Sequence, residues 1–420
     1  MTTTAVSTEH GFTASGFEPV RDVLVNSPLI GTGGAAFAAY VDGELVVDVR
    51  AGYARPGELW QADTLAMLMS LTKSFMAFCI QILDDRGEID LDERVAHYWP
   101  EFAAAGKQDI TVKQLMLHTA GAIRVPPQLR LMQADGEGWD DYDEIAAALA
   151  AEAPAWKPGT EHGYHALTFG WLVGEVLRRI TGLTPGEFFG KEVSGPLGLD
   201  IQIGLGDAEL ARLARIIDFE SGELGFPQKL FLPRLMRTMT DPTKQSGMAF
   251  GGTGGRSLFS DVVALTEHGG ILRAEVMSSS ACSTAASLAR FFSIFALGGE
   301  LDGRRLISEE SLREWSEPQL TAADCTLTTS LPRWAVKAGQ IDKVTVTRTL
   351  GYLYNDKPHR IPRYFGPTPS AVGGLGAGGQ VAFADPVRRV SAGLVRNALA
   401  HKPDFGNQVI EAFYNCLDRK

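Results

Sequence analysis

A serine and a lysine three residues apart are the pair in this chain best suited to chemistry. Ser70 and Lys73 begin a run, Ser70 to Arg86, whose apolar residues recur at spacings of three and four before Gly87, which predicts a helix. Residues three apart on a helix face the same way, so a neutral lysine could take the proton of the serine hydroxyl. Burial and the positive end of the helix both disfavour the ammonium form. The helix start also exposes backbone N–H groups that could hold a developing oxyanion.

The alternative interpretation of this pair is an ordinary capped helix. A two-residue pattern occurs by chance roughly once in a chain of this length. Ser70 and Lys73 form the one Ser-x-x-Lys in the sequence, so the decision depends on whether other stretches supply catalytic partners.

Two further stretches could supply those partners. A loop with Pro158-Gly159 turn chemistry leads to Tyr164, and a tyrosine beside a charged lysine can have a lowered pKa and act as general base or acid. The run Gly373 to Gln380 is rich in glycine and precedes the apolar strand from Val381, so its backbone could approach a ligand closely. The alternatives are a structural aromatic ring for Tyr164 and a flexible turn for the glycines.

Composition excludes several function classes. The 420 residues carry a formal net charge of −11 with no clustered basic run, so we expect no nucleic-acid partner. We expect no membrane span, because no apolar stretch is long enough, and no metal site, because His162 and His165 are the one close histidine pair. No nucleotide-binding glycine motif occurs, so no cofactor is expected. Oligomeric state is not readable from the sequence.

The chemistry of the termini and cysteines predicts a cytoplasmic protein. The first residues lack the basic and apolar regions of a secretory signal. The cysteines form no Cys-x-x-Cys pair and no disulfide framework, so we expect reduced thiols at Cys79, Cys282, Cys325 and Cys416.

Strand patterns at both ends of the chain enclose a mostly helical middle. Asp42-Gly43 predicts a hairpin between two β-rich runs, and Asp385-Pro386 separates two more near the end. This order predicts an α+β fold, an antiparallel sheet flanked by helices with a mostly helical second lobe inserted. The expected division is a loose N-terminal arm (1–16), a discontinuous sheet domain (17–95 and 285–420) and the helical insertion (96–284). Helices are expected at 17–26, 70–86, 111–118, 142–151, 169–180, 185–189, 284–295 and 405–417.

Taken together, these motifs resemble a known family. Ser70-Leu71-Thr72-Lys73, Leu117-His118-Thr119-Ala120-Gly121, Pro158 to Ala166 and Gly376 to Gly379 follow the order and spacing of the serine β-lactamase and penicillin-binding proteins. More narrowly, the chain is similar to the class C-like branch that includes family VIII carboxylesterases, over roughly residues 17–415.

The resemblance implies a role for each residue. Ser70 would be the nucleophile, Lys73 its activating partner and Tyr164 the general base or acid. The N–H groups of Ser70 and Ala377 would form the oxyanion hole. Substrate would be bound near four further positions, His165, Gly374, Gly376 and Gly378.

Departures from the family pattern point to the substrate. Ala166 stands where class C β-lactamases have asparagine, and Gly374-Leu375-Gly376 replaces their Lys-Thr-Gly, so a cation for a β-lactam carboxylate is missing. Lys337-Ala338-Gly339 is a rival for that element but precedes two β-runs and does not enter the last hairpin. The sequence therefore predicts a serine carboxylesterase that acts on a neutral acyl ester. The alternatives are an acyltransferase or an amide or β-lactam hydrolase with the same acyl-enzyme, and a non-catalytic binding protein with a relict pocket.

Overall fold

The computed structural model describes residues 5–8, 10–31, 33–126, 129, 138–217, 237–252, 257, 262–267, 269–328, 344–356, 364–399 and 404–419. The expected Lys337-Ala338-Gly339 element lies outside them. No helix in these ranges is long and apolar enough to cross a membrane.

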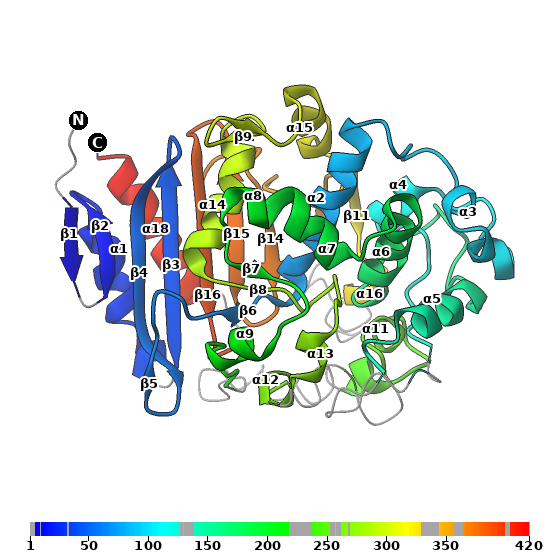
Figure 1. Ribbon diagram of the computed structural model, residues 1–420, viewed down its shortest axis with the longest axis horizontal. Helices are drawn as coiled ribbons and strands as arrows, with labels where there is room; N and C mark the ends of the chain where they lie inside the picture. Colours follow the sequence, from blue (N-terminus) through cyan, green and yellow to red (C-terminus); the bar gives the residue numbers. More distant parts are fainter. Residues whose placement is uncertain are drawn as a thin grey trace, which may run out of the picture.

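One large antiparallel sheet organises the molecule (Figure 1). Its strand order is β1-β2-β4-β3-β16-β15-β14-β13-β12-β11, and β5 pairs with β4. The strands are β1 (Ala5–Thr8), β2 (Gly11–Ala14), β3 (Gly34–Val41), β4 (Glu44–Arg55), β5 (Glu58–Leu59), β11 (Leu320–Ala323), β12 (Thr345–Arg348), β13 (Leu353–Tyr354), β14 (Val372–Gly376), β15 (Gln380–Asp385) and β16 (Val390–Arg396). There are also two small sheets. One has the strand order β6 (Ala66–Met67), β8 (Cys282–Ser283), β7 (Ile201–Gln202), and the other pairs β9 (Glu300–Leu301) with β10 (Arg304–Arg305).

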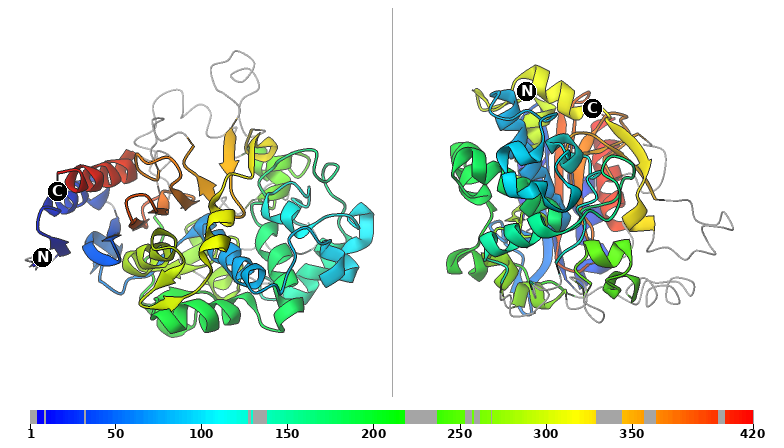
Figure 2. Two further views of the ribbon diagram at one scale, coloured as in Figure 1. Left: turned by 90° about the horizontal axis from the view of Figure 1, so that it is seen from above. Right: turned by 90° about the vertical axis from the view of Figure 1, so that its right-hand side faces the viewer.

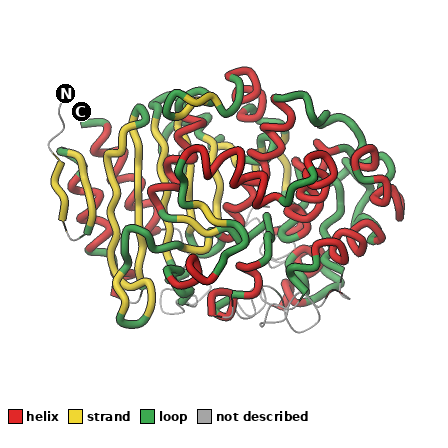
Figure 3. Tube along the Cα trace, in the orientation of Figure 1, coloured by secondary structure: helices red, strands yellow, loops and turns green. Residues whose placement is uncertain are grey.

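The helices lie on both faces of this sheet and beyond one end of it (Figures 1 and 3). The α-helices are α1 (Glu18–Val25), α2 (Thr72–Asp85), α3 (Val95–Tyr98), α4 (Val112–Met116), α5 (Tyr142–Ala151), α6 (Thr168–Thr181), α7 (Pro185–Phe189), α8 (Gly195–Leu197), α9 (Asp207–Ala211), α11 (Gln245–Ala249), α12 (Ala264–Glu267), α13 (Gly270–Arg273), α14 (Ala285–Ala296), α15 (Glu309–Ser316), α16 (Cys325–Thr328) and α18 (Asp404–Leu417). Tighter or wider turns form η1 (Pro28–Gly31), η2 (Met69–Leu71), η3 (Pro100–Gly106) and η5 (Gly190–Ser194).

Alternation along β3 builds two hydrophobic cores, one on each face of the sheet. Phe37 and its alternate neighbours pack against α1 and α18, where the ring of Phe37 lies 6.0 Å from that of Phe413. Ala36, Ala38 and Tyr40 face the opposite core, which includes α2 and α14. The right-hand view of Figure 2 shows α18 on one side of the sheet and α2 on the opposite side. A strand buried on both faces is apolar throughout, as β3 is.

The α+β architecture predicted from the sequence is confirmed. Strands from both ends of the chain share one sheet, and the turn Asp42-Gly43 has the positive φ values, 52° and 82°, of the predicted hairpin. The residue limits of the three predicted regions stay a prediction.

One local expectation was wrong, and the alternative of a flexible turn is excluded for part of the glycine run. Residues 5–8 and 11–14 of the expected loose arm form a hairpin, and its second strand pairs with β4 at the sheet edge. The glycine run from Gly373 is not a flexible turn along its whole length, because residues up to Gly376 belong to β14 and pair with β15. In both cases pairing with a long neighbouring strand satisfies the backbone.

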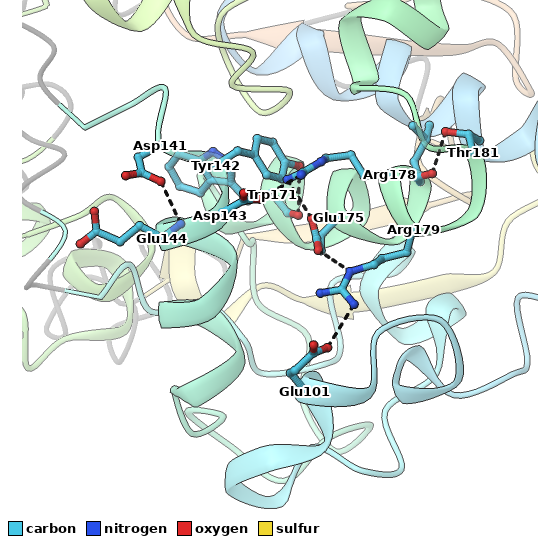
Figure 4. Close-up of polar contacts among 11 residues, drawn as sticks. Glu101, Asp141, Tyr142, Asp143, Glu144, Trp171, Glu175, Arg178, Arg179 and Thr181 are labelled. Carbon is cyan, nitrogen blue, oxygen red and sulfur yellow. Dashed lines mark hydrogen bonds and ion pairs between the residues drawn. The ribbon is translucent and has the colours of Figure 1, made fainter.

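Charged side chains join the helices of the second lobe (Figure 4). The buried carboxylate of Glu175 in α6 accepts from Arg178 at 3.2 Å and from Arg179 at 2.7 Å. Arg179 also pairs with Glu101 of η3 at 3.3 Å. Tyr142, at the start of α5, donates to the carbonyl of Trp171 at 3.3 Å. These contacts fix α5, α6 and η3 relative to one another.

Lys107 provides a stability prediction for the same lobe. Its side chain is fully buried, and its ammonium donates to the carbonyls of Ala104 (3.0 Å), Ala150 (2.8 Å) and Glu152. Lys107→Met would leave these acceptors without their donor, so we expect a loss of about 2 to 3 kcal/mol of unfolding free energy. Urea unfolding measures it. Lys113→Met, at a more exposed lysine of α4, is the control, and equal midpoints for the two variants would contradict the prediction.

Candidate active site

Ser70 sits in a strained turn that leads directly into α2. It is half-buried, and the residue before it, Met69, has a left-handed φ of 52°. Such a conformation is unfavourable for a residue with a side chain and must be held by its surroundings. The backbone N–H of Leu68 donates to the carbonyl of Ala281 at 2.8 Å. The Thr72 hydroxyl donates to the carbonyl of Met69 at 2.7 Å and accepts from the N–H of Ala281 at 3.1 Å, so it ties the Ser70 turn to the segment around Ala281.

Lys73 is buried in the first turn of α2. Its Nζ donates to the carbonyl of Ala166 at 2.7 Å and to that of Ser278 at 2.8 Å. Burial, and then the charge of Arg348, hold the pKa of Lys73 well below its ordinary value. A neutral amine has two N–H donors and one lone pair. Two carbonyl partners use both donors and leave the lone pair free to accept a proton.

Tyr164 meets both of these residues. The Nζ of Lys73 lies 4.8 Å from the centroid of its ring. Burial raises the pKa of Tyr164 to about 12, although a hydrogen bond with Ser70 and the charge of Arg348 oppose the increase. The phenol is therefore protonated at neutral pH and bonded to the serine hydroxyl. The structure thus brings together the three residues for which the sequence predicted catalytic roles.

The glycines of β14 and the following turn lie against the Ser70 segment. A Cβ on Gly376 would be 2.2 Å from the carbonyl oxygen of Leu68, and one on Gly378 would be 2.3 Å from the Leu399 side chain. The half-buried Ala377 lies between them. The oxyanion hole formed by the N–H groups of Ser70 and Ala377 stays a prediction. The packing supports it, because it brings the backbone beside Ala377 next to the backbone that precedes Ser70.

Gly374 has no space for a side chain. A Cβ there would be 2.5 Å from the Ser74 hydroxyl and 3.2 Å from the Leu71 side chain. A large cationic residue at this position would require α2 to move. The structure therefore agrees with the absence of an anion-binding residue from this part of the site.

Gly376→Ala should reduce activity strongly. Its Cβ would overlap the carbonyl of Leu68, two residues before Ser70, and β14 would have to move away from the nucleophile. We expect kcat for an ester to fall by about 10²- to 10³-fold, the effect of losing one oxyanion donor. Gly31→Ala, at an exposed position without a positive φ where a Cβ would meet nothing within 4 Å, is the control. Wild-type kcat in Gly376→Ala would contradict the packing argument.

His165, predicted to bind substrate, lies in the interior beside Tyr164. It is 1% exposed, its backbone N–H donates to Nδ1 of His118 at 3.2 Å, and its own Nδ1 faces the carbonyl of Gly163 at 2.8 Å. Its ring centroid is 6.0 Å from that of Trp156. These contacts support the loop that carries Tyr164, and a contact of His165 with substrate stays a prediction.

Sequence reasoning missed two residues that contact this loop from other parts of the chain, Arg348 and Asp324. Arg348 donates through Nε to Nε2 of His162 at 2.8 Å, and Asp324 accepts from the backbone N–H of Tyr164 at 3.2 Å. These residues are distant in sequence, and the only signal was a charge within a β-like run. Among the described residues no group of three or more His, Cys, Asp or Glu is arranged to hold a metal ion.

Comparison with known proteins agrees with this geometry. The Beta-lactamase family model matches residues 27–410, so the chain belongs to that family. Esterase/beta-lactamase LipL of Mycobacterium tuberculosis is 33% identical over 377 residues, which are 87% of this chain and 77% of the relative. A penicillin-binding protein homologue from Caulobacter crescentus has a TM-score of 0.76 at 32% identity, covering 96% of this chain and 98% of that one. A family VIII carboxylesterase structure has a TM-score of 0.76 at 31% identity with the same coverage. The predicted family resemblance is confirmed.

Proposed function

We propose that this protein is a serine hydrolase that cleaves carboxylic esters through an acyl-enzyme at Ser70. The observation that carries the proposal is the buried Lys73, one helical turn after Ser70, whose Nζ donates to two backbone carbonyls and lies 4.8 Å from the centroid of the Tyr164 ring. The resemblance to an esterase/beta-lactamase and to a family VIII carboxylesterase supports the same reaction class.

In the first half-reaction Ser70 Oγ attacks the ester carbonyl carbon. The serine proton passes to the lone pair of Lys73, directly or through the Tyr164 hydroxyl. The N–H groups of Ser70 and Ala377 would stabilise the tetrahedral oxyanion. The bond to the alcohol oxygen then breaks, and Tyr164 protonates that oxygen while Lys73 returns a proton to Tyr164. Water attacks the acyl-enzyme in the second half-reaction, and Ser70 recovers its proton as the acid leaves.

A neutral acyl group fits the site best. Gly374 supplies no cation that would pair with a substrate carboxylate, and burial disfavours the ammonium form of Lys73. The protein should therefore hydrolyse simple esters better than β-lactams, whose carboxylate needs such a partner.

A substrate panel tests the proposal. We would measure kcat/KM with p-nitrophenyl acetate, butyrate and octanoate and with nitrocefin. Rapid ester turnover with slow nitrocefin hydrolysis is the expected result, and the series ranks acyl length. Efficient nitrocefin hydrolysis without esterase activity would overturn the preference for neutral esters. Turnover of none of them would favour the non-catalytic alternative.

Acyl transfer is the second candidate, because both reactions share the acyl-enzyme. Adding alcohols or amines to the ester assay measures the partition of the acyl group between water and the acceptor. A constant yield of free acid across acceptor concentrations is expected for a hydrolase. A yield that falls in proportion to ester or amide product would identify a transferase.

The proposed location is the cytoplasm. Cys79, Cys282 and Cys325 carry free thiols, which suits a reducing compartment. Fractionation of cells that produce the protein tests this, and recovery outside the cytoplasm would contradict it.

A further inference from the structure

Arg348, the last residue of β12, brings a buried positive charge to the Tyr164 loop. Its side chain is almost inaccessible, with 7% of the residue exposed, and its Cζ lies 5.5 Å from the centroid of the Tyr164 ring. Lys73 Nζ lies 4.8 Å from the same centroid. Two basic side chains therefore contact one tyrosine, and only one of them can avoid carrying a charge, because a guanidinium stays protonated at neutral pH.

The immediate partner of Arg348 is a neutral histidine. Its Nε–H donates to Nε2 of His162, which fixes the proton of this imidazole on Nδ1. Burial and the charge of Arg348 lower the pKa of His162 to about 3, so the ring does not become a second cation at neutral pH. His162 is two residues before Tyr164, so this hydrogen bond also restrains the loop that carries the phenol.

The counter-charge is Asp324, which is itself held in place. Its Oδ1 accepts from the N–H groups of Tyr164 (3.2 Å) and Leu327 (2.9 Å). Its Oδ2 lies 3.8 Å from Nδ1 of His162, beyond hydrogen-bond distance. Asp324 thus offsets part of the Arg348 charge, although its carboxylate makes no hydrogen bond to the His162 ring.

We propose that Arg348 is a positioning residue of this site, a fixed positive charge that adds to burial in disfavouring the ammonium form of Lys73 and, through His162, holds Tyr164 in place. The inference rests on the proposed hydrolase function. It adds the group that helps Lys73 to stay able to accept the Ser70 proton. Repulsion between two cations disfavours the ammonium form of Lys73 in the presence of the guanidinium. Tyr164, in contrast, is stabilised as a phenolate by the same charge, which helps it to relay a proton.

The titratable groups around this charge come from several elements. Lys73 faces it from α2, the Tyr164 loop contributes His162 and His165, His118 follows α4, and Asp324 precedes α16. Burial and neighbouring positive charges lower the pKa of His118 far below its ordinary value and that of His165 to about 3. The histidines therefore stay neutral across the usual assay range, and the acidic limb of a pH–rate profile would report the protonation of Lys73.

Two variants separate the charge of Arg348 from its hydrogen bond. Arg348→Gln keeps an N–H donor for His162 but is neutral, whereas His162→Leu removes the hydrogen bond and keeps the guanidinium. We would measure kcat/KM for p-nitrophenyl butyrate against pH in the wild type and both variants, after confirming folding by circular dichroism. Removing the positive charge raises the pKa of Lys73, so the acidic midpoint should rise by about one pH unit or more in Arg348→Gln. It should stay near the wild-type value in His162→Leu.

A purely structural role would lower kcat/KM at every pH and leave the midpoint unchanged, and that result in folded Arg348→Gln would overturn the inference. An equal shift in His162→Leu, which keeps the guanidinium, would also overturn it. If Arg348→Gln does not fold, Asp324→Asn supplies the opposite test, because losing the negative charge should lower the midpoint. An unchanged or raised midpoint there would reject the inference. Absence of Ser70-dependent turnover in the wild type would instead refute the proposed function.

Discussion

Replacing Lys73 with methionine is expected to lower kcat/KM for a carboxylic ester by about 10²- to 10⁴-fold, the usual contribution of a positioned base. Methionine fills a similar volume but has no lone pair with which to accept the Ser70 proton. The fold should persist, because burial already disfavours the charged form of this amine, although the carbonyls of Ala166 and Ser278 lose their donor.

Two controls make this prediction specific to the amine. Lys113→Met removes a lysine that is partly exposed and paired with Asp92 at 3.7 Å, and it should retain wild-type kinetics. The wild type should remain active at neutral pH, because the pKa of Lys73 is far below its ordinary value, and should lose activity as acid protonates the amine. Stopped-flow release of p-nitrophenolate measures both effects. Undiminished acylation in Lys73→Met would assign the base elsewhere.

Tyr164→Phe should cause a loss of similar size, about 10²- to 10⁴-fold, but one that depends on the leaving group. Phenylalanine preserves the ring, whose centroid lies 5.3 Å from that of His118, and removes the hydroxyl bonded to Ser70. If that hydroxyl protonates the departing alcohol, the rate for an ethyl ester should fall more than the rate for the p-nitrophenyl ester of the same acid. Ethoxide is strongly basic and must be protonated as it leaves, whereas p-nitrophenolate leaves without a proton.

The comparison of these two esters is the measurement. A larger loss with the ethyl ester than with the p-nitrophenyl ester is expected in Tyr164→Phe, whereas Lys73→Met should affect both alike. Equal losses in Tyr164→Phe would remove the general-acid role and leave tyrosine as a relay to Lys73. Wild-type rates with both esters would exclude Tyr164 from the reaction.

Local patterns predicted the elements that local chemistry determines. The predicted helix at 142–151 matches α5. Thr111 caps α4, because its side-chain oxygen accepts from the backbone N–H of Gln114. The Asp42-Gly43 hairpin also follows from residues that tolerate positive φ. Each of these features is decided within a few residues, so the sequence alone was sufficient.

Features decided by distant partners were missed. Arg348 and His162 are 186 positions apart, and nothing near either residue indicates their hydrogen bond. The sequence left open a flexible turn for the run from Gly373, because glycine has low strand propensity, yet pairing with β15 makes the part up to Gly376 a strand that approaches Leu68 closely. The site could be predicted only where family motifs carried it, and its supporting charges could not.

Trapping the acyl-enzyme tests the central claim most directly. Acid-quenched mixtures of the protein with p-nitrophenyl butyrate would be analysed by intact mass and by peptide mapping, with Ser70→Ala in parallel. We predict a mass increase of one butyryl group on the peptide that contains Ser70, and neither adduct nor turnover in Ser70→Ala. Normal ester turnover by Ser70→Ala, or a butyryl group on another residue of the wild type, would contradict the account.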